Sequence, residues 1–183
     1  MKFPDSLILK IRKGAEGDIY LPGSKSISIR ALLLASLAKG ETTILGLLNS
    51  EDTKIMITVL KSLGVVIDLI EDDIEDGIFD DSGNINIKVK GCDGFFPNLK
   101  KKHSICLNVG NSGLTIRTIL PALSISMFNS KANSTVILNG IERMRERPIS
   151  ELVDGLCFLG SDIKYLESSG FVPLQIKPSN FIS

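Results

Sequence analysis

Apolar residues recur with two different periods along this chain, and stretches of the two kinds alternate. Residues 31–38 are almost wholly apolar and predict a helix from about Ser26 to Lys39 that is buried on most sides and stopped by Gly40. A second helical pattern covers residues 52–64. Short segments rich in β-branched residues lie before, between and after these helices and predict strands. The predicted strands are residues 6–13, 18–22, 42–48, 65–71 and 84–91.

The second half of the chain repeats this order of elements. A helix with a polar start and an apolar body is predicted for residues 111–127, a strand for residues 134–140 and a further helix for residues 148–160. The last of these helices has one apolar face, formed by Ile149, Leu152, Val153, Leu156 and Leu159.

An alignment of the two halves supports an internal duplication. The stretch VLKSLGVVIDLIE aligns with GLCFLGSDIKYLE, which pairs Gly64 with Gly160 as helix C-caps and Ile67 with Ile163 in the strands that follow. We therefore expect an α/β fold of repeated βαβαβ-type units, rather than a doubly wound sheet with one nucleotide site.

Composition limits the partners and the compartment of the protein. The 183 residues include 21 Lys+Arg and 21 Asp+Glu, so a formal net charge of +0 gives no global basic field for nucleic acid or an anionic membrane. The three cysteines are odd in number and share no C-x-x-C spacing, so they indicate neither a disulfide framework nor a zinc site. No apolar signal region precedes the first helix, and that helix is too short to span a bilayer. These features favour a reducing cytoplasm.

Charge gathers instead in local segments. The acidic run from Glu71 to Asp81 is typical of a solvated turn between two strands. Cations are found in SKSISIR, NSGLTIR and ERMRERP. Lys25 and Arg30 lie in the first turns of a predicted helix, where the helix dipole disfavours them unless an anion is the neighbour. The serines beside Lys25 allow a phosphate to approach closely, so this helix start predicts an anion site.

Two glycine-containing motifs precede predicted helices. GSKS is not a Walker A motif, because Ser24 stands where that motif has glycine before its lysine. In VGNSGLTIR, glycines bracket Asn111 and Ser112, which suits either a capped turn or an anion nest. If the two units place their first helix starts side by side, residues 24–30 and 111–117 converge on one electropositive spot.

The third basic motif, ERMRERP, alternates three arginines with two glutamates. In an extended segment, Arg143, Arg145 and Arg147 would point to one face, although a loop need not obey that period. At least one of them is expected to be an ion-pair partner, and Pro148 is expected to open the next helix. His103, the only histidine, is interpreted as an exposed loop residue, and no pair of carboxylates in the motifs suits general acid and base catalysis.

Taken together, LPGSKSISIRALLLASLAKG, GNSGLTIR and ERMRERPISELVDGLCFLGSDIKYLE closely resemble the N-terminal part of the 5-enolpyruvylshikimate-3-phosphate (EPSP) synthase family, from about Leu21 to Ile176. The motifs occur in the family's order and are joined by matching spacers such as LLNSEDTKIMITVLKSLGV. The sister family, UDP-N-acetylglucosamine enolpyruvyl transferase, has asparagine after the motif lysine and usually a cysteine in its catalytic loop. Ser26 follows Lys25 here, and no cysteine of this chain falls in a comparable loop.

The resemblance implies transfer of the enolpyruvyl group of phosphoenolpyruvate to the 5-hydroxyl of shikimate 3-phosphate, with release of phosphate and without a metal or organic cofactor. Carried over by motif, Lys25 contacts both substrates, and Ser26 and Arg30 hold the phosphate ester of shikimate 3-phosphate. Gly113 and Arg147 hold phosphoenolpyruvate. The residues that support this loop are Asn111, Arg117 and Arg143.

The resemblance also implies a longer protein. Family members have two lobes of three such units each, arranged as inside-out α/β barrels, with the active site between the lobes. Residues 1–20 resemble the strand segment of the other lobe, and residues 21–183 resemble two of the three units of the first lobe. We therefore expect a fragment or one half of a split enzyme, inactive alone, with a separate chain as a partner that supplies the second lobe. The alternatives are a non-catalytic anion-binding remnant and a relative of the sister family.

Overall fold

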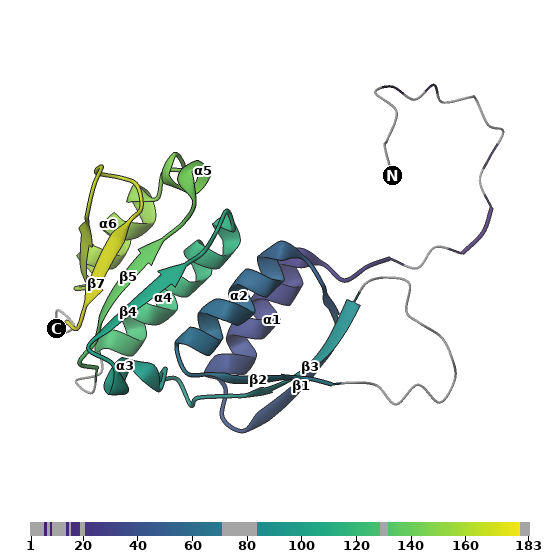
Figure 1. Cartoon of the computed structure of the whole chain (residues 1–183), viewed down its shortest axis with the longest axis horizontal. Helices are drawn as coiled ribbons and strands as arrows, with labels where there is room; N and C mark the ends of the chain where they lie inside the picture. Colours follow the sequence, from purple (N-terminus) through teal and green to yellow (C-terminus); the bar gives the residue numbers. More distant parts are fainter. Residues whose placement is uncertain are drawn as a thin grey trace.

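The computed structural model describes residues 6, 8, 14, 16–18, 21–70, 84–128 and 132–179. The described chain forms two consecutive units (Figure 1). The first unit comprises α1 (Lys25–Leu37), β1 (Glu41–Leu48), α2 (Glu51–Ser62), β2 (Val66–Leu69) and β3 (Asn84–Lys90). After the short helix α3 (Asn98–Lys101), the second unit comprises β4 (Ser104–Asn108), α4 (Gly113–Phe128), β5 (Thr135–Asn139), α5 (Glu142–Arg145), α6 (Ser150–Phe158), β6 (Asp162–Tyr165) and β7 (Leu174–Lys177).

The sheet topology confirms the duplication. Strand order is β1-β3-β2 in the first sheet and β4-β5-β7-β6 in the second, so β5, β7 and β6 repeat the order of β1, β3 and β2. In both units the last strand lies antiparallel between the other two. The second sheet has in addition β4, which pairs with β5 in parallel. Each unit therefore ends with a further strand. In the first unit this strand, β3, lies within the predicted strand at residues 84–91, whereas β7 in the second unit was not predicted.

The two aligned helix ends have the same geometry. After α2, Gly64 has φ 94° and Val65 N–H donates to Leu60 O at 3.1 Å, and after α6, Gly160 has φ 102° and Ser161 N–H donates to Leu156 O at 3.0 Å. Both ends are Schellman caps, in which glycine adopts the left-handed conformation at little cost. The predicted equivalence of Gly64 and Gly160 is confirmed.

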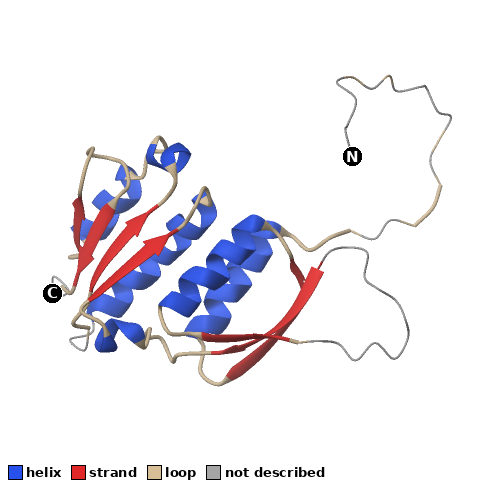
Figure 2. Cartoon of the chain, viewed as in Figure 1, coloured by secondary structure: helices blue, strands red, loops and turns tan. Residues whose placement is uncertain are grey.

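The helices lie inside and the sheets lie further out. Helices α1, α2 and α4 lie side by side through the middle of the molecule, and the sheet β1-β3-β2 covers one side of α1 and α2 (Figures 1 and 2). One continuous apolar core joins the units, from Ile29 and Leu32 on α1, through Met56 on α2, to Ile116 and Leu120 on α4. This packing fixes the start of α1 relative to the start of α4.

Helix α1 is less buried than its composition predicts. It ends at Leu37, because Ala38 has an extended backbone, and Gly40 at φ 88° leads into β1. Ile27 and Leu34 remain 67% and 68% exposed. The reason is that α1 packs against α2, α4 and the first sheet, which leaves one side of the helix open.

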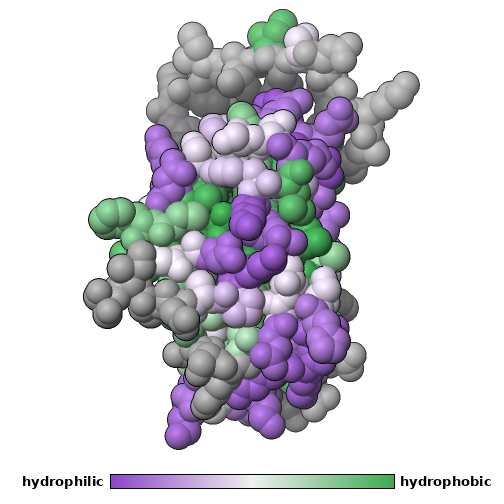
Figure 3. All heavy atoms as spheres, turned by 90° about the vertical axis from the view of Figure 1, so that its left-hand side faces the viewer, coloured by the Kyte–Doolittle hydropathy of each residue, from purple (hydrophilic) through white to green (hydrophobic). Residues whose placement is uncertain are grey.

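The second unit also exposes apolar side chains. Leu159, which we placed on the apolar face of α6, is 53% exposed, and Phe158 beside it is 85% exposed. The equivalent Leu63 is fully buried, because the segment that starts α3 covers it and Asn98 N–H donates to its carbonyl at 3.0 Å. A view onto the end of the molecule formed by the second unit shows apolar groups at the surface among polar ones (Figure 3).

Some elements were not predicted, and some predictions lie outside the described residues. The unpredicted elements are α3, α5, β4 and β7. The predicted strand at residues 6–13 and the acidic run at residues 71–81 lie wholly or mostly outside the described residues. Of the predicted strand at residues 18–22, the described Asp18, Leu21 and Pro22 have no regular structure.

Candidate functional site

The starts of α1 and α4 meet at an open cavity of about 420 Å³. The two segments predicted to converge both contribute to its wall, together with the start of α2 and the loop before α6. The lining residues are Lys25, Asp52, Asn111, Gly113, Leu114, Arg117 and Arg147.

Helix α1 begins without a side-chain cap among the described residues. Its N-cap residue Ser24 makes no side-chain capping hydrogen bond, and its first turn contains no acidic residue. Helix α2 differs, because Ser50 and Thr53 form a reciprocal capping box at its start. The N–H groups and positive dipole end of α1 therefore remain available to an anion beside Lys25, whereas those of α2 are partly satisfied.

Lys25 has one acidic neighbour in the cavity. Its ammonium lies 3.3 Å from the Asp52 carboxylate, and the two side chains are 52% and 26% exposed. Asp52 belongs to the first turn of α2, where the helix dipole favours a negative charge. An ion pair this exposed contributes less than about 1 kcal/mol, so a multiply charged anion can displace Asp52 from Lys25.

The loop between β4 and α4 is held by its own hydrogen bonds. Asn108 Oδ1 accepts from Gly110 N–H at 2.8 Å, and the Gly110 carbonyl accepts from Ile141 N–H at 3.1 Å. Ser112 Oγ lies 2.8 Å from Thr115 Oγ1 in the first turn of α4. Of the two interpretations left open for VGNSGLTIR, the structure shows a turn capped by Ser112, and this turn places Gly113 at the cavity.

Two guanidinium groups pack against this loop. Arg147 Nη1 donates to Asn111 O at 3.3 Å, and Arg117 donates from Nη1 to Gly113 O at 3.2 Å and from Nη2 to Pro148 O at 3.0 Å. A Cβ atom on Gly113 would lie 2.8 Å from Arg147 Nη1 and 3.1 Å from Arg117 Nη1, a distance that only glycine tolerates without a shift. Each guanidinium has five N–H donors, so both arginines retain donors for a ligand.

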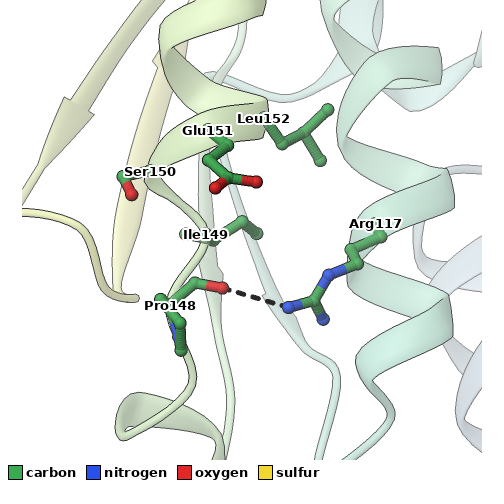
Figure 4. A pocket seen from close by; sticks show the side chains of 6 residues that line it. All are labelled: Arg117, Pro148, Ile149, Ser150, Glu151 and Leu152. Carbon is green, nitrogen blue, oxygen red and sulfur yellow. Dashed lines mark hydrogen bonds between the residues drawn. The ribbon is translucent and has the colours of Figure 1, made fainter.

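Arg117 also borders a second, smaller cavity of about 260 Å³ beside α6 (Figure 4). The hydrogen bond from the Arg117 guanidinium to the Pro148 carbonyl crosses one side of this recess. Ile149 and Leu152 contribute apolar side chains to its wall. Glu151 lines it as well. Because this carboxylate offsets the arginine, the larger cavity is better suited to an anion.

The three arginines of ERMRERP do not share a face. Residues 142–145 form the short helix α5, which contradicts an extended conformation for this segment. Arg143 pairs with Glu146 at 2.6 Å and Arg145 with Glu167 at 3.0 Å, so the expected structural ion-pair partners are present. Of the three arginines, Arg147 alone lines the larger cavity.

Other predicted residues lie outside the cavity wall. Ser26 and Arg30 are on α1, but they do not line the larger cavity. Pro148 does not open α6, because Ile149 is the N-cap and the helix begins at Ser150. His103 is exposed just before β4, as predicted.

Asp52 is a cavity residue that sequence reasoning missed. Cations and small hydroxyl residues mark the motifs of this chain, and Asp52 lies in a spacer between two of them. The capping pattern S-E-D-T, residues 50–53, could have placed it in the first turn of the helix that follows the predicted strand at residues 42–48. Nothing local in the sequence indicated that this turn would face Lys25.

The arrangement is suited to bind an anion with several negative charges. Three cations and one carboxylate line the cavity, and the starts of α1, α2 and α4 contribute to its wall. Within the described residues, no cluster of three or more His, Cys, Asp or Glu side chains could hold a metal ion. The cavity wall offers fixed positive charge and N–H donors, which hold phosphate and carboxylate groups.

Known proteins are similar to this chain over most of its length. The family model described as EPSP synthase (3-phosphoshikimate 1-carboxyvinyltransferase) matches residues 9–182. The chain is 40% identical over 162 residues to the 3-phosphoshikimate 1-carboxyvinyltransferase of Pasteurella multocida (strain Pm70), covering 88% of this chain and 34% of that protein. It is 38% identical over 174 residues to the chloroplastic protein of the same name from Petunia hybrida, covering 94% of this chain and 31% of that protein.

A solved structure shows the same fold. The EPSP synthase structure from Acinetobacter baumannii superposes with a TM-score of 0.71 at 24% identity, covering 90% of this chain and 33% of that chain. The chain thus spans about a third of the length of the curated relatives it matches. Among the described residues, no helix is long and apolar enough to cross a membrane.

Proposed function

Because the chain belongs to the EPSP synthase family, we propose that it supplies one wall of the active site of a 3-phosphoshikimate 1-carboxyvinyltransferase. The observation that supports this most directly is the cavity in which Lys25, Arg117 and Arg147 surround Gly113 at two helix starts. Shikimate 3-phosphate and phosphoenolpyruvate are both multiply charged anions. Bringing them together requires fixed positive charge that offsets their repulsion.

In this proposal, Lys25 contacts both substrates, because it starts α1 and faces the loop that precedes α4. Ser26 and Arg30 bind the phosphate of shikimate 3-phosphate from the same helix, outside the wall that this chain forms alone. Gly113 and Arg147 bind phosphoenolpyruvate. Asn111 and Arg117 support them through the hydrogen bonds described above.

Arg143 keeps the supporting role that the family motif implies. Its guanidinium pairs with Glu146 and lies outside the cavity wall. We propose that it holds the loop that carries Arg147, and that it does not touch a substrate.

The chemistry is an addition followed by an elimination. The 5-hydroxyl gives up its proton to a base as its oxygen bonds to C2 of phosphoenolpyruvate, and an acid protonates C3, which gives a tetrahedral intermediate. A base then removes a proton from C3 while the bond between C2 and the phosphate oxygen breaks, which releases inorganic phosphate. Asp52 is the only carboxylate in the cavity wall of the described chain, and it faces Lys25. The groups that donate and accept protons are therefore expected in the two thirds of the family's length that this chain does not cover.

We further propose that residues 21–183 correspond to two of the three units of one lobe and residues 1–20 to a strand segment of the other lobe. The second lobe would come from a separate chain or from further sequence, and three free cysteines fit a reducing cytoplasm. A non-catalytic anion-binding remnant remains the alternative function. Its cavity would bind phosphate equally well, so only turnover separates the two.

Calorimetric titration of the chain with phosphoenolpyruvate and with shikimate 3-phosphate tests the binding role. Lys25→Ala is expected to weaken both affinities by roughly tenfold or more, since a charge-assisted contact contributes about 1.5 to 3 kcal/mol. Lys39→Ala is the matched control, because it removes an exposed lysine beyond the other end of the same helix. Equal losses of affinity in the two variants would show that Lys25 does not contact the ligands.

A further inference from the structure

A separate recess is lined by residues of α2, β2 and β3, and it shares no lining residue with the anion cavity. Its volume is about 360 Å³, within the range of about 300 to 1,000 Å³ typical of small-molecule sites. Branched apolar side chains from α2, β2 and β3 form its floor. They are Ile57, Ile67, Ile85 and Ile87.

Two lysines form the rim of this groove. Lys54 and Lys61 both line it from α2, and their spacing of seven residues places them on one side of the helix, about 10 Å apart along its axis. Both are exposed, and neither forms an ion pair with a described residue. Among the described residues, the groove therefore combines an apolar floor with a positive rim that has no acidic partner.

The internal repeat shows that the fold does not require this groove. The positions equivalent to Lys54, Lys61 and Leu69 in the second unit are Ser150, Cys157 and Tyr165. The Tyr165 hydroxyl is buried. Burial raises the pKa of this hydroxyl, and the negative charge of Asp154 nearby raises it further. Leu69 is instead 69% exposed. One copy of the unit thus has a tyrosine hydroxyl buried near an acidic residue, where the other has an open recess with two cations.

We infer that the groove binds a small amphipathic anion, with a carboxylate or phosphate head group at Lys54 and Lys61 and a short apolar body over the isoleucines. The charge of the rim selects against a neutral ligand, and the apolar floor selects against a simple inorganic ion. Two cations and one small recess do not provide the extended basic surface that a nucleic acid needs.

Methyl NMR titration of the chain with octanoate tests the inference. The methyl resonances of Ile57, Ile85 and Ile87 are expected to shift and saturate. Acetate has the carboxylate of octanoate but not its alkyl chain, and octan-1-ol has the alkyl chain but no charge. Each is therefore expected to bind roughly tenfold more weakly than octanoate. Octyl phosphate, compared with octanoate, distinguishes the two head groups.

Matched variants distinguish the groove from general adsorption. Lys54→Gln with Lys61→Gln should weaken octanoate binding roughly tenfold, and Lys101→Gln with Lys102→Gln, which removes the same charge from exposed lysines elsewhere, should not. Leu69→Asp should weaken binding, whereas Leu45→Asp, at a similarly exposed strand position outside the groove, should not. All the substituted side chains are exposed, so the variants and their controls are expected to fold.

Two results would overturn the inference. One is octanoate binding that does not depend on the two rim lysines. The other is a roughly tenfold gain in octanoate affinity when the acidic residues of Glu71 to Asp81 are made neutral, which would identify that segment of the chain as the occupant. Lys25→Ala is expected to leave octanoate binding unchanged, so failure of the proposed enzyme function would not affect this outcome.

Discussion

The Lys25 ammonium and the Asp52 carboxylate lie 3.3 Å apart in the wall of a cavity that otherwise presents arginines and helix starts. The carboxylate holds the lysine in place without a ligand and partly cancels its charge. A bound phosphate or carboxylate group must compete with Asp52 for this lysine. The pair therefore lowers the affinity of the empty site for simple anions.

Asp52→Asn is expected to strengthen binding of phosphoenolpyruvate by up to roughly tenfold, because it removes a competing negative charge from an exposed pair. Calorimetric titration of the two proteins measures this change. Glu51→Gln is the matched control, since it removes the neighbouring charge from the same helix turn but does not line the cavity. Weaker binding by Asp52→Asn would show that Asp52 positions Lys25 for the ligand instead of competing with it.

Gly113→Ala is expected to weaken phosphoenolpyruvate binding by roughly tenfold or more while changing the free energy of unfolding by less than about 1 kcal/mol. The new methyl group would lie 2.8 Å from Arg147 Nη1, and the flexible guanidinium would move away from the ligand position. Titration and chemical denaturation measure the two effects. Gly155→Ala is the control, because its Cβ would meet no atom within 4 Å and would favour α6. Unchanged affinity in Gly113→Ala would show that ligand binding by Arg147 does not require its guanidinium to lie this close to residue 113.

The repeat and both helix starts could be predicted from sequence, because periodicity and the aligned glycines Gly64 and Gly160 are local signals. The pairing of β7 between β5 and β6 could not, since a four-residue strand leaves little local pattern. The arginines of ERMRERP diverge because one turn of helix replaces the extended segment. Asp52 reaches Lys25 only through the packing of α1 on α2, which no short motif records.

The glycine loop departs from the family motif G-N-A-G-T-A-x-R-P at four positions, which are occupied by Ser112, Leu114, Thr115 and Thr118. Leu114 stands at the threonine position and lines the cavity, and Thr118 stands at the proline position and donates from Oγ1 to the Leu114 carbonyl at 2.9 Å. In this family glyphosate competes with phosphoenolpyruvate. We expect Leu114→Thr with Thr118→Pro to bind glyphosate roughly tenfold more tightly than the parent chain, because the smaller side chain widens the pocket. Competition with phosphoenolpyruvate measures this, and equal affinities would show that the loop already fits the inhibitor.

Phe158 and Leu159 are expected to drive self-association of the chain. They are 85% and 53% exposed, whereas the residue equivalent to Leu159 in the first unit is fully buried by the following segment. Phe158→Ser with Leu159→Ser should shift sedimentation toward the monomer. Leu45→Ser with Val66→Ser removes exposed apolar groups from the first sheet and should not. Equal effects of the two pairs would show that association is not localised to α6.

Phosphorus NMR of a mixture of shikimate 3-phosphate and phosphoenolpyruvate tests the proposed function most directly. The chain alone is expected to release no phosphate, because a single wall cannot align two substrates, and alignment provides about 7 to 11 kcal/mol of such a barrier. Combined with the part of a curated relative that the match does not cover, about two thirds of that protein, it should release phosphate and form the enolpyruvyl product. Lys25→Ala should abolish that reaction, and Lys39→Ala should not. Phosphate release by the chain alone, or a reconstituted rate that does not change with Lys25→Ala, would contradict the proposal.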